Sequence, residues 1–162
     1  AASTRVGNLL GEERFVDARY SSFVSVGLCF FGALLNMTFL ILLGDSFISL
    51  YTTDALVFGV ASQLLIYAAI FQIPDGIGMG SLGALRGYKD TFMTMVFLVI
   101  AYWIFAIPFG YFLTYYGINE PMGASGMWIS MIVGLVIFAG LISLRLRKIS
   151  SAFIIRPILG TG

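Results

Sequence analysis

Residues 55–85, ALVFGVASQLLIYAAIFQIPDGIGMGSLGAL, form a long apolar run that carries a single charged residue, Asp75. A helix needs about 20 apolar residues to cross the roughly 30 Å hydrocarbon core of a bilayer, and this run is longer than that. An acid at membrane depth costs about 2.5 to 3.5 kcal/mol on insertion scales, so it is found where it faces a cavity, an ion or a partner. The run predicts a transmembrane helix, and Asp75 is its first functional candidate.

Three further runs have membrane length and contain no charged residue: residues 20–44, 91–117 and 121–144. The whole chain is 59% hydrophobic and 10% charged, with a mean hydropathy of +0.98, whereas about 25% of a soluble domain is charged. Four such helices have no polar face to present to water, which excludes a fully buried soluble core. We therefore predict an all-α integral membrane protein with four transmembrane helices within residues 20–148.

The basic residues predict how this bundle is oriented. All nine lie before the first predicted helix, between the second and third, or after the fourth: Arg5, Arg14, Arg19, Arg86, Lys89, Arg145, Arg147, Lys148 and Arg156. The other two connections carry only acids: Asp45, Asp54 and Glu120. Because Lys and Arg concentrate in cytoplasmic loops, we expect both ends of the segment to be cytoplasmic. Membrane topology then accounts for the basic residues, and we expect no nucleic-acid partner.

The same pattern divides the rest of the chain. Residues 1–19 are predicted to form the end of a preceding helix and a cytoplasmic loop, and residues 149–162 a cytoplasmic tail. The chain does not begin with Met, so we expect it to be a piece of a longer protein.

The sequence lacks the residues that several kinds of enzymatic catalysis require. The chain has no histidine, and its single cysteine, Cys29, lies within an apolar run. Histidine bases, histidine metal ligands and an intrachain disulfide are thereby excluded. An intramembrane aspartyl enzyme would need a second acid beside Asp75, and the four runs contain none. We expect a protein that is not an enzyme and that binds no organic cofactor.

The residues around Asp75 predict an irregular helix. Pro74 precedes the acid, and glycines follow it at positions 76, 78, 80 and 83, so the helix is expected to bend or partly unwind. Pro74 has no N–H for the carbonyl of Ile70, which leaves a free oxygen one turn from the Asp75 carboxylate. Broken membrane helices use such a pair to coordinate sodium or a proton-carrying water.

One face of this predicted helix collects polar and aromatic side chains. At helical spacing, Tyr67, Phe71, Gln72, Asp75 and Met79 lie on the same face. Gln72 is then in position to hydrogen-bond the acid.

Four stretches carry more specific signals. They are AASTRVG at 1–7 with LGE at 10–12, QIPDG at 72–76 leading into GALRGYKDT at 83–91, AYW at 101–103 with PFGY at 108–111, and GASGMW at 123–128. Through them, roughly residues 1–148 resemble the carboxy-terminal part of multidrug and toxic compound extrusion (MATE) transporters, with the NorM-type bacterial branch the most similar. The LRGYKD loop at 85–90 is the most specific of these signals.

The resemblance implies an architecture and a function. MATE transporters have twelve helices in two lobes, and the chain would supply the end of helix eight and helices nine to twelve, within the C-terminal lobe. It implies a multi-pass antiporter of the bacterial inner membrane that exports cationic or amphipathic drugs by alternating access, driven by sodium ions or protons. The lipid bilayer, the N-terminal lobe and helices seven and eight would then be partners of this segment.

The resemblance also implies a site. Asp75 falls on the tenth-helix acid that the NorM-type branch uses for cation coupling, with sodium as the candidate metal. The predicted supporting ligands are Gln72 and the Ile70 carbonyl. The candidate residues lining the substrate cavity are Tyr67, Phe71 and Met79. Some relatives have a tyrosine where this chain has Phe71, so that hydroxyl is missing here. The family's partner glutamate belongs to helix seven, before Ala1, so this segment alone cannot complete a cation site.

Two alternative functions fit the same sequence. The chain could be a non-transporting membrane scaffold or assembly subunit, in which Asp75 and the small residues Gly76, Gly80 and Ala84 form an interhelical packing contact. It could also be a lipid-linked saccharide flippase of the same superfamily. A flippase favours a basic central cavity for a pyrophosphate, and no Lys or Arg lies in the four runs.

Overall fold

The computed structural model describes residues 1–117 and 120–159, with side chains as far as Ile155. Its elements are α1 (Ala2–Gly11), α2 (Phe15–Tyr51), α3 (Ala55–Gly87), α4 (Thr91–Val99), the π-helix η1 (Ile100–Ala106), α5 (Ile107–Tyr115) and α6 (Ala124–Leu159). No strand occurs in these residues.

Four helical rods are long and apolar enough to cross a membrane. They are Phe15–Tyr51, Ala55–Gly87, Thr91–Tyr115 and Ala124–Ile155. Most of their apolar side chains point outward. In the most apolar 18-residue stretch of each rod, between 6% and 33% of the residues are buried. Outward-facing apolar surface on this scale fits a bilayer as the solvent. The prediction of an all-α membrane protein with four transmembrane helices is confirmed.

The helices reach beyond the predicted spans. α2 begins at Phe15 and ends at Tyr51, and α6 continues through the predicted tail as far as Leu159. Charged residues mark where a membrane ends, whereas a helix ends where its backbone hydrogen bonds find other partners. At the start of α3, for example, the Asp54 carboxylate accepts a hydrogen bond from the Leu56 N–H at 2.8 Å.

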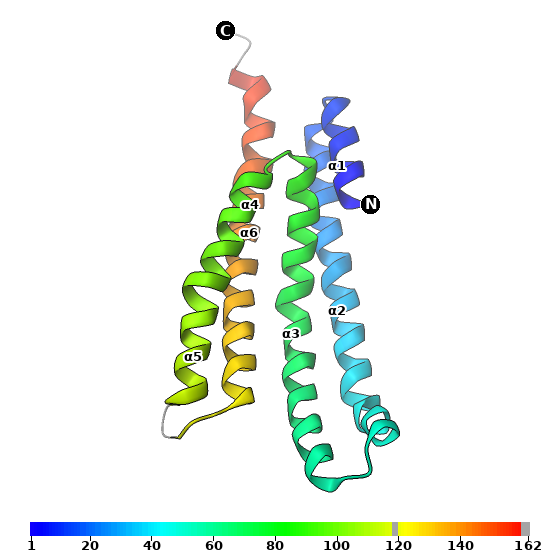
Figure 1. The fold of residues 1–162 in the computed structure, drawn as a ribbon. Coiled ribbons are helices and arrows are strands. Elements are labelled where there is room, and N and C mark those ends of the chain that lie inside the picture. Colours follow the sequence, from blue (N-terminus) through cyan, green and yellow to red (C-terminus); the bar gives the residue numbers. More distant parts are fainter. Residues whose placement is uncertain (118–119, 160–162) are drawn as a thin grey trace.

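Figure 1 shows how the helices are arranged. α3 lies between α2 and α6, and the continuous rod formed by α4, η1 and α5 packs along α6. The α1–α2 connection, the α3–α4 turn and the C-terminal part of α6 lie at one end of the bundle (Figure 1). We call this the basic end, because the Lys and Arg residues whose side chains are described belong to α1, the α1–α2 connection, the start of α2, the last turn of α3 with the α3–α4 turn, and the C-terminal part of α6.

Small residues bring α2 and α3 into close contact. A Cβ atom on Gly76 would lie 2.7 Å from the Ala33 Cβ and 2.9 Å from the Cys29 carbonyl oxygen. On Gly80 it would lie 2.8 Å from the Cα of Val26. These glycines therefore let the two backbones approach, as small residues do in membrane helix pairs.

The third rod contains an irregularity that the sequence analysis did not predict. Residues Ile100–Ala106 form a π-helix, which ends two residues before Pro108, a residue with no N–H to donate. The Ser130 hydroxyl of α6 donates a hydrogen bond to the Ala106 carbonyl. A neighbouring helix thus supplies a donor where the rod widens, as is common at π-helical turns in membrane helices.

The structure tests one of the two irregularities predicted at Pro74. α3 is α-helical without a break from Ala55 to Gly87, and Pro74 is buried within it. The expectation that the helix unwinds there is wrong, whereas the expected bend stays a prediction. Close packing of the following glycines against α2 supports the backbone, so one missing hydrogen bond does not open the helix.

Candidate functional site

Asp75 lies in the interior of α3, nearer its C-terminal end, on a side that neither α2 nor α6 covers closely. Gly76 and Gly80 face α2, and Gly78 faces α6, where an added Cβ would lie 3.4 Å from the Phe138 ring. Two turns after Asp75, Leu82 lines a cavity of 330 Å³ together with residues of α4. Positions seven apart share a helix face, so Asp75 points toward the rod formed by α4 and η1.

Tyr102 of η1 lies within electrostatic range of Asp75, although no hydrogen bond joins the two among the described residues. Its half-buried side chain lies close enough to Asp75 for the charge of the carboxylate to act on it. The AYW stretch at 101–103 contributes only to the family resemblance, and no pattern in the sequence predicts this placement of Tyr102. The register of Tyr102 depends on the π-helix, which has no reliable sequence signal.

The structure separates the other predicted site residues. Phe71 packs edge-on against Trp128 of α6, with ring centroids 6.2 Å apart and planes at 78°. Met79 is 54% exposed and Ile70 is 42% exposed, whereas Tyr67 is half-buried. Phe71 therefore belongs to the contact between α3 and α6, and the assignment of a cavity to these residues stays a prediction.

Gln72 does not support Asp75 as expected. Both side chains are half-buried, yet no side-chain hydrogen bond joins them within the described part of the chain. A spacing of three residues places two side chains on adjacent positions of a helix but does not fix their rotamers. The predicted hydrogen bond is absent from this conformation.

The ligands available near Asp75 suit a monovalent cation only in part. Among residues 1–117 and 120–155, no group of three or more His, Cys, Asp or Glu could hold a metal ion. Asp75 supplies one carboxylate, and Tyr102, on which its charge acts, is the nearest candidate for a second oxygen ligand. Further oxygen ligands would have to come from backbone carbonyls, water or residues outside this segment.

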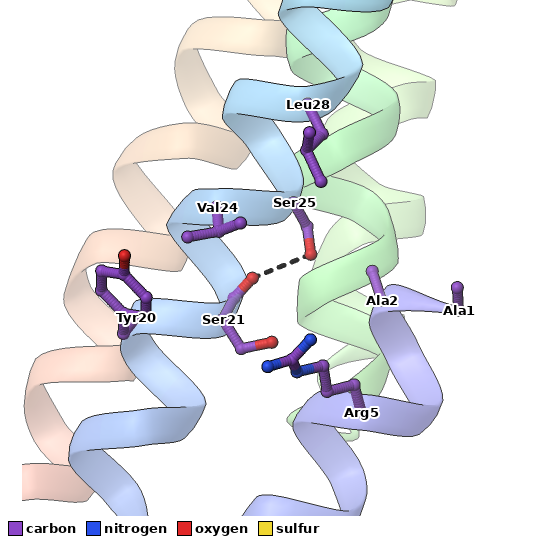
Figure 2. A pocket seen from close by; sticks show the side chains of 8 residues that line it. All are labelled: Ala1, Ala2, Arg5, Tyr20, Ser21, Val24, Ser25 and Leu28. Atoms are coloured by element: carbon purple, nitrogen blue, oxygen red, sulfur yellow. Dashed lines mark hydrogen bonds between the residues drawn. The ribbon is translucent and has the colours of Figure 1, made fainter.

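A small cavity near the start of the chain has fewer groups that could bind a cation. It has a volume of 180 Å³ and lies between α1 and α2 (Figure 2). Arg5 points toward Ser21, and the Ser25 hydroxyl donates to the Ser21 carbonyl at 2.8 Å (Figure 2). The serine hydroxyl is thus satisfied within its own helix, and this cavity has no carboxylate to bind a cation.

The LRGYKD loop is an anchor between helices. The Arg145 Nε of α6 donates to the Asp90 carboxylate at 2.7 Å, and the Tyr88 ring packs 5.4 Å from that of Phe153. Burial raises the pKa of the Tyr88 hydroxyl, which the Ser22 hydroxyl approaches to 3.5 Å. The loop therefore fastens the ends of α2, α3 and α6 together.

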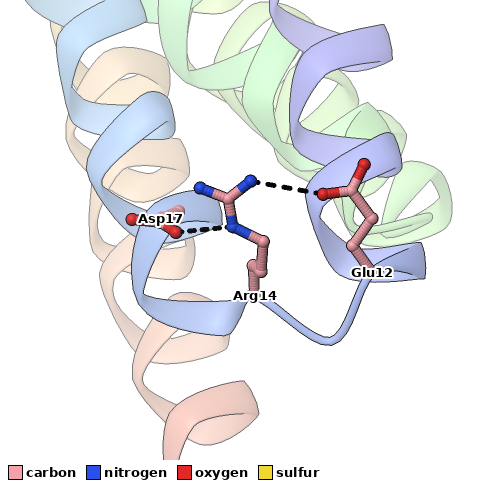
Figure 3. A network of polar contacts seen from close by, with 3 residues as sticks. All are labelled: Glu12, Arg14 and Asp17. Carbon is pink, nitrogen blue, oxygen red and sulfur yellow. Dashed lines mark hydrogen bonds and ion pairs between the residues drawn. The ribbon is translucent and has the colours of Figure 1, made fainter.

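We expect Asp90→Asn to destabilise the protein, because it breaks a partly buried ion pair whose side chains are 28% and 14% exposed. A hydrogen bond to a charged group contributes about 1.5 to 3 kcal/mol. The matched control is Asp17→Asn, which breaks the pair between Asp17 and Arg14, 52% and 58% exposed (Figure 3). Thermal unfolding of the purified full-length protein should show a lower Tm for Asp90→Asn alone, since exposed pairs contribute little. Equal Tm values for both variants would contradict the anchoring role.

Comparisons with known proteins give a consistent result. The family model described as MatE matches residues 1–112. The chain is 37% identical over 153 residues to "Probable multidrug resistance protein NorM" of Bacillus cereus, covering 94% of this chain and 33% of that protein. It is 42% identical over 148 residues to "Multidrug resistance protein NorM" of Vibrio vulnificus, covering 91% and 32%.

A solved structure gives the same fold. The crystal structure of the eukaryotic MATE transporter AtDTX14 matches 96% of this chain and 35% of its own length, with a TM-score of 0.80 and 22% sequence identity. This likeness supports the fold alone. The chain spans about a third of the length of the curated relatives that it matches.

Proposed function

The chain belongs to the MatE family, and from this premise we propose that it forms part of the C-terminal lobe of a cation-coupled multidrug efflux antiporter. The bacterial relatives bear names of multidrug resistance proteins, which supports drug export as the activity of the whole protein. We place the protein in the bacterial inner membrane with both ends of this segment cytoplasmic. This placement is supported by the gathering of basic residues at one end of the bundle.

The observation that carries this proposal is the position of Asp75. Its carboxylate is half-buried in the middle of an apolar helix and has no side-chain hydrogen bond within the described residues. A carboxylate placed in this way is stabilised when a proton, a sodium ion or a cationic solute neutralises it. Because one negative charge accommodates one of these at a time, a coupling cation entering from one side displaces a cationic drug. Mutual exclusion of this kind is the basis of antiport.

The coupling cation can be identified by transport into vesicles. Full-length protein is reconstituted in liposomes, and accumulation of a fluorescent lipophilic cation is followed under a sodium gradient or a proton gradient imposed separately. The proposal predicts that the lipophilic cation accumulates against its own concentration gradient under at least one of these two ion gradients. Downhill leakage that neither gradient alters would reject cation coupling.

No observation in the structure supports either of the two alternative functions. The scaffold hypothesis uses Gly76 and Gly80 for assembly, yet both glycines pack against α2 of the same chain. The flippase hypothesis needs basic residues in a central cavity at membrane depth, whereas the described Lys and Arg belong to parts of the chain at the basic end (Figure 1).

We expect Tyr102→Phe to weaken coupling without abolishing it. The substitution keeps the ring and removes the hydroxyl, which we propose as a cation ligand beside Asp75. Loss of one uncharged hydrogen-bonding group corresponds to about 0.5 to 1.5 kcal/mol, or roughly 2- to 10-fold in affinity. The half-saturating concentration of the coupling cation should rise by that factor in the vesicle assay. Tyr111→Phe, an exposed tyrosine of α5, serves as the control, and equal values for both variants would remove Tyr102 from the site.

A further inference from the structure

Another cavity lies on the side of α3 away from Asp75. It has a volume of 420 Å³, is open to one side and is lined by α2, α3 and α6. α3 contributes Ile77, which lies two residues after Asp75 and so points to the opposite side of the helix. We call this cavity the α2–α3–α6 groove.

The groove changes from apolar to cationic along its length. Phe30 lines its deeper part, and Phe23 lines the part nearer the basic end; seven residues of helix separate them by about 10 Å. Arg147 of α6, which is exposed, stands at the basic-end mouth, one turn after Ser143. A second arginine, Arg19, lies over the Phe23 ring with its guanidinium carbon 5.8 Å from the ring centroid.

The polar groups inside the groove are already satisfied, whereas those at its mouth are not. The hydroxyls of Ser81 and Ser143 lie 3.2 Å apart and bond to each other. Arg147 forms no ion pair with an acid in the part of the chain whose side chains are described. A ligand would therefore meet apolar walls at depth and at least one unneutralised arginine at the mouth.

We propose that the α2–α3–α6 groove binds an anionic phospholipid, with an acyl chain between the helices and the phosphate held by Arg147 and assisted by Arg19. A phospholipid has the same order of polarity along its length as the groove, and arginine pairs with phosphate through two parallel hydrogen bonds. Basic pockets between membrane helices bind anionic head groups in this way. A cationic drug is repelled by the same arginines, so the lipid site is separate from the site at Asp75.

Lipid retention by the full-length protein tests the proposal. Native mass spectrometry compares bound phosphatidylglycerol with phosphatidylcholine carrying the same acyl chains. A Cβ on Gly27 meets nothing within 4 Å, so Gly27→Leu should fill the groove without displacing a neighbour. Gly32, on the same helix and also open, does not line the groove and provides the control Gly32→Leu.

The expected results separate the acyl chain from the head group. Wild-type protein should retain phosphatidylglycerol about tenfold more than phosphatidylcholine, because both lipids offer a phosphate to Arg147 but the choline cation of phosphatidylcholine is repelled by the arginines at the mouth. Arg147→Gln should remove that preference, whereas Lys148→Gln, a change at the neighbouring exposed lysine, should leave it. Gly27→Leu should reduce retention of both lipids, and Gly32→Leu should not. Equal retention of the two lipids by wild type, or unchanged retention by Gly27→Leu, would overturn the proposal.

A photo-crosslinking residue at position 30 distinguishes a lipid from another part of the protein. Phe30 is half-buried and lines the deep part of the groove. Crosslinks to lipid in bilayer-embedded protein support the proposal. Crosslinks to another helix of the full-length transporter would show that protein fills the groove and would overturn it.

Discussion

Asp75→Asn in the full-length transporter is expected to abolish cation-driven drug export. The variant keeps the shape of the side chain and removes the negative charge that we propose both cations share. At 4 Å and an effective dielectric constant of 20, one pair of unit charges interacts by about 4 kcal/mol, which corresponds to about a thousandfold in affinity. Accumulation of a lipophilic cation in everted vesicles should therefore fall to the level of vesicles without the transporter.

Two further variants make this result specific. Asp54→Asn changes the same residue type on the same helix, at the N-cap of α3, where asparagine also caps well; its export should match wild type. Asp75→Glu keeps the charge and should retain part of the activity. Normal insertion and an unchanged Tm of Asp75→Asn would show that the fold is intact. Export by Asp75→Asn at the wild-type rate would reject the coupling role.

Gly80→Val is expected to destabilise the protein strongly. A Cβ at this position would lie 2.8 Å from the Cα of Val26 and 3.3 Å from the Ser25 carbonyl oxygen. Both contacts are to backbone, which cannot yield as a side chain does, so α2 and α3 must separate. Overpacking costs about 1 to 3 kcal/mol, and we expect the upper part of that range here.

Gly59→Val provides the matched control, because Gly59 lies on the same helix and an added Cβ there meets nothing within 4 Å. Thermal unfolding of the two purified variants, compared with wild type, should show a Tm lower by several degrees for Gly80→Val and a small change for Gly59→Val. The same low Tm in both variants would attribute the loss to valine in a helix rather than to the contact between α2 and α3.

The sequence predicts the membrane fold well because its strongest pattern, the long uncharged runs, reflects the lipid environment of the helices. Uncharged runs such as 20–44 and 121–144 have the length that a bilayer requires, and acids or bases separate them. The small residues Gly76 and Gly80 pack α3 against a neighbouring helix, as their spacing predicts.

Features that depend on two helices at once were less predictable. Pro74 and Pro108 have the same local effect on hydrogen bonding, yet the backbone stays α-helical around the first and is π-helical before the second. The difference lies in the neighbours: α2 packs closely against Gly76 and Gly80, which follow Pro74, whereas Ser130 of α6 donates to the carbonyl of Ala106. A single sequence does not show which helices become neighbours.

The candidate site was predicted in part for the same reason. Asp75 stands out in the sequence because its cost in a membrane is large and local. The position of Tyr102 depends on how the third rod packs, and the contact of Phe71 with Trp128 depends on the position of α6. The hydrogen bond expected from Gln72 depends on rotamers, which helical spacing alone leaves open.

Equilibrium binding of a radiolabelled lipophilic cation to purified full-length protein tests most directly whether drug and coupling cation share Asp75. Affinity is measured across a series of pH values and sodium concentrations, for wild type and Asp75→Asn. We predict that protons or sodium ions weaken binding to wild type by competition, and that binding to Asp75→Asn is weak and independent of both. The same dependence on protons or sodium in Asp75→Asn as in wild type would show that the two cations meet elsewhere and would contradict the proposed mechanism.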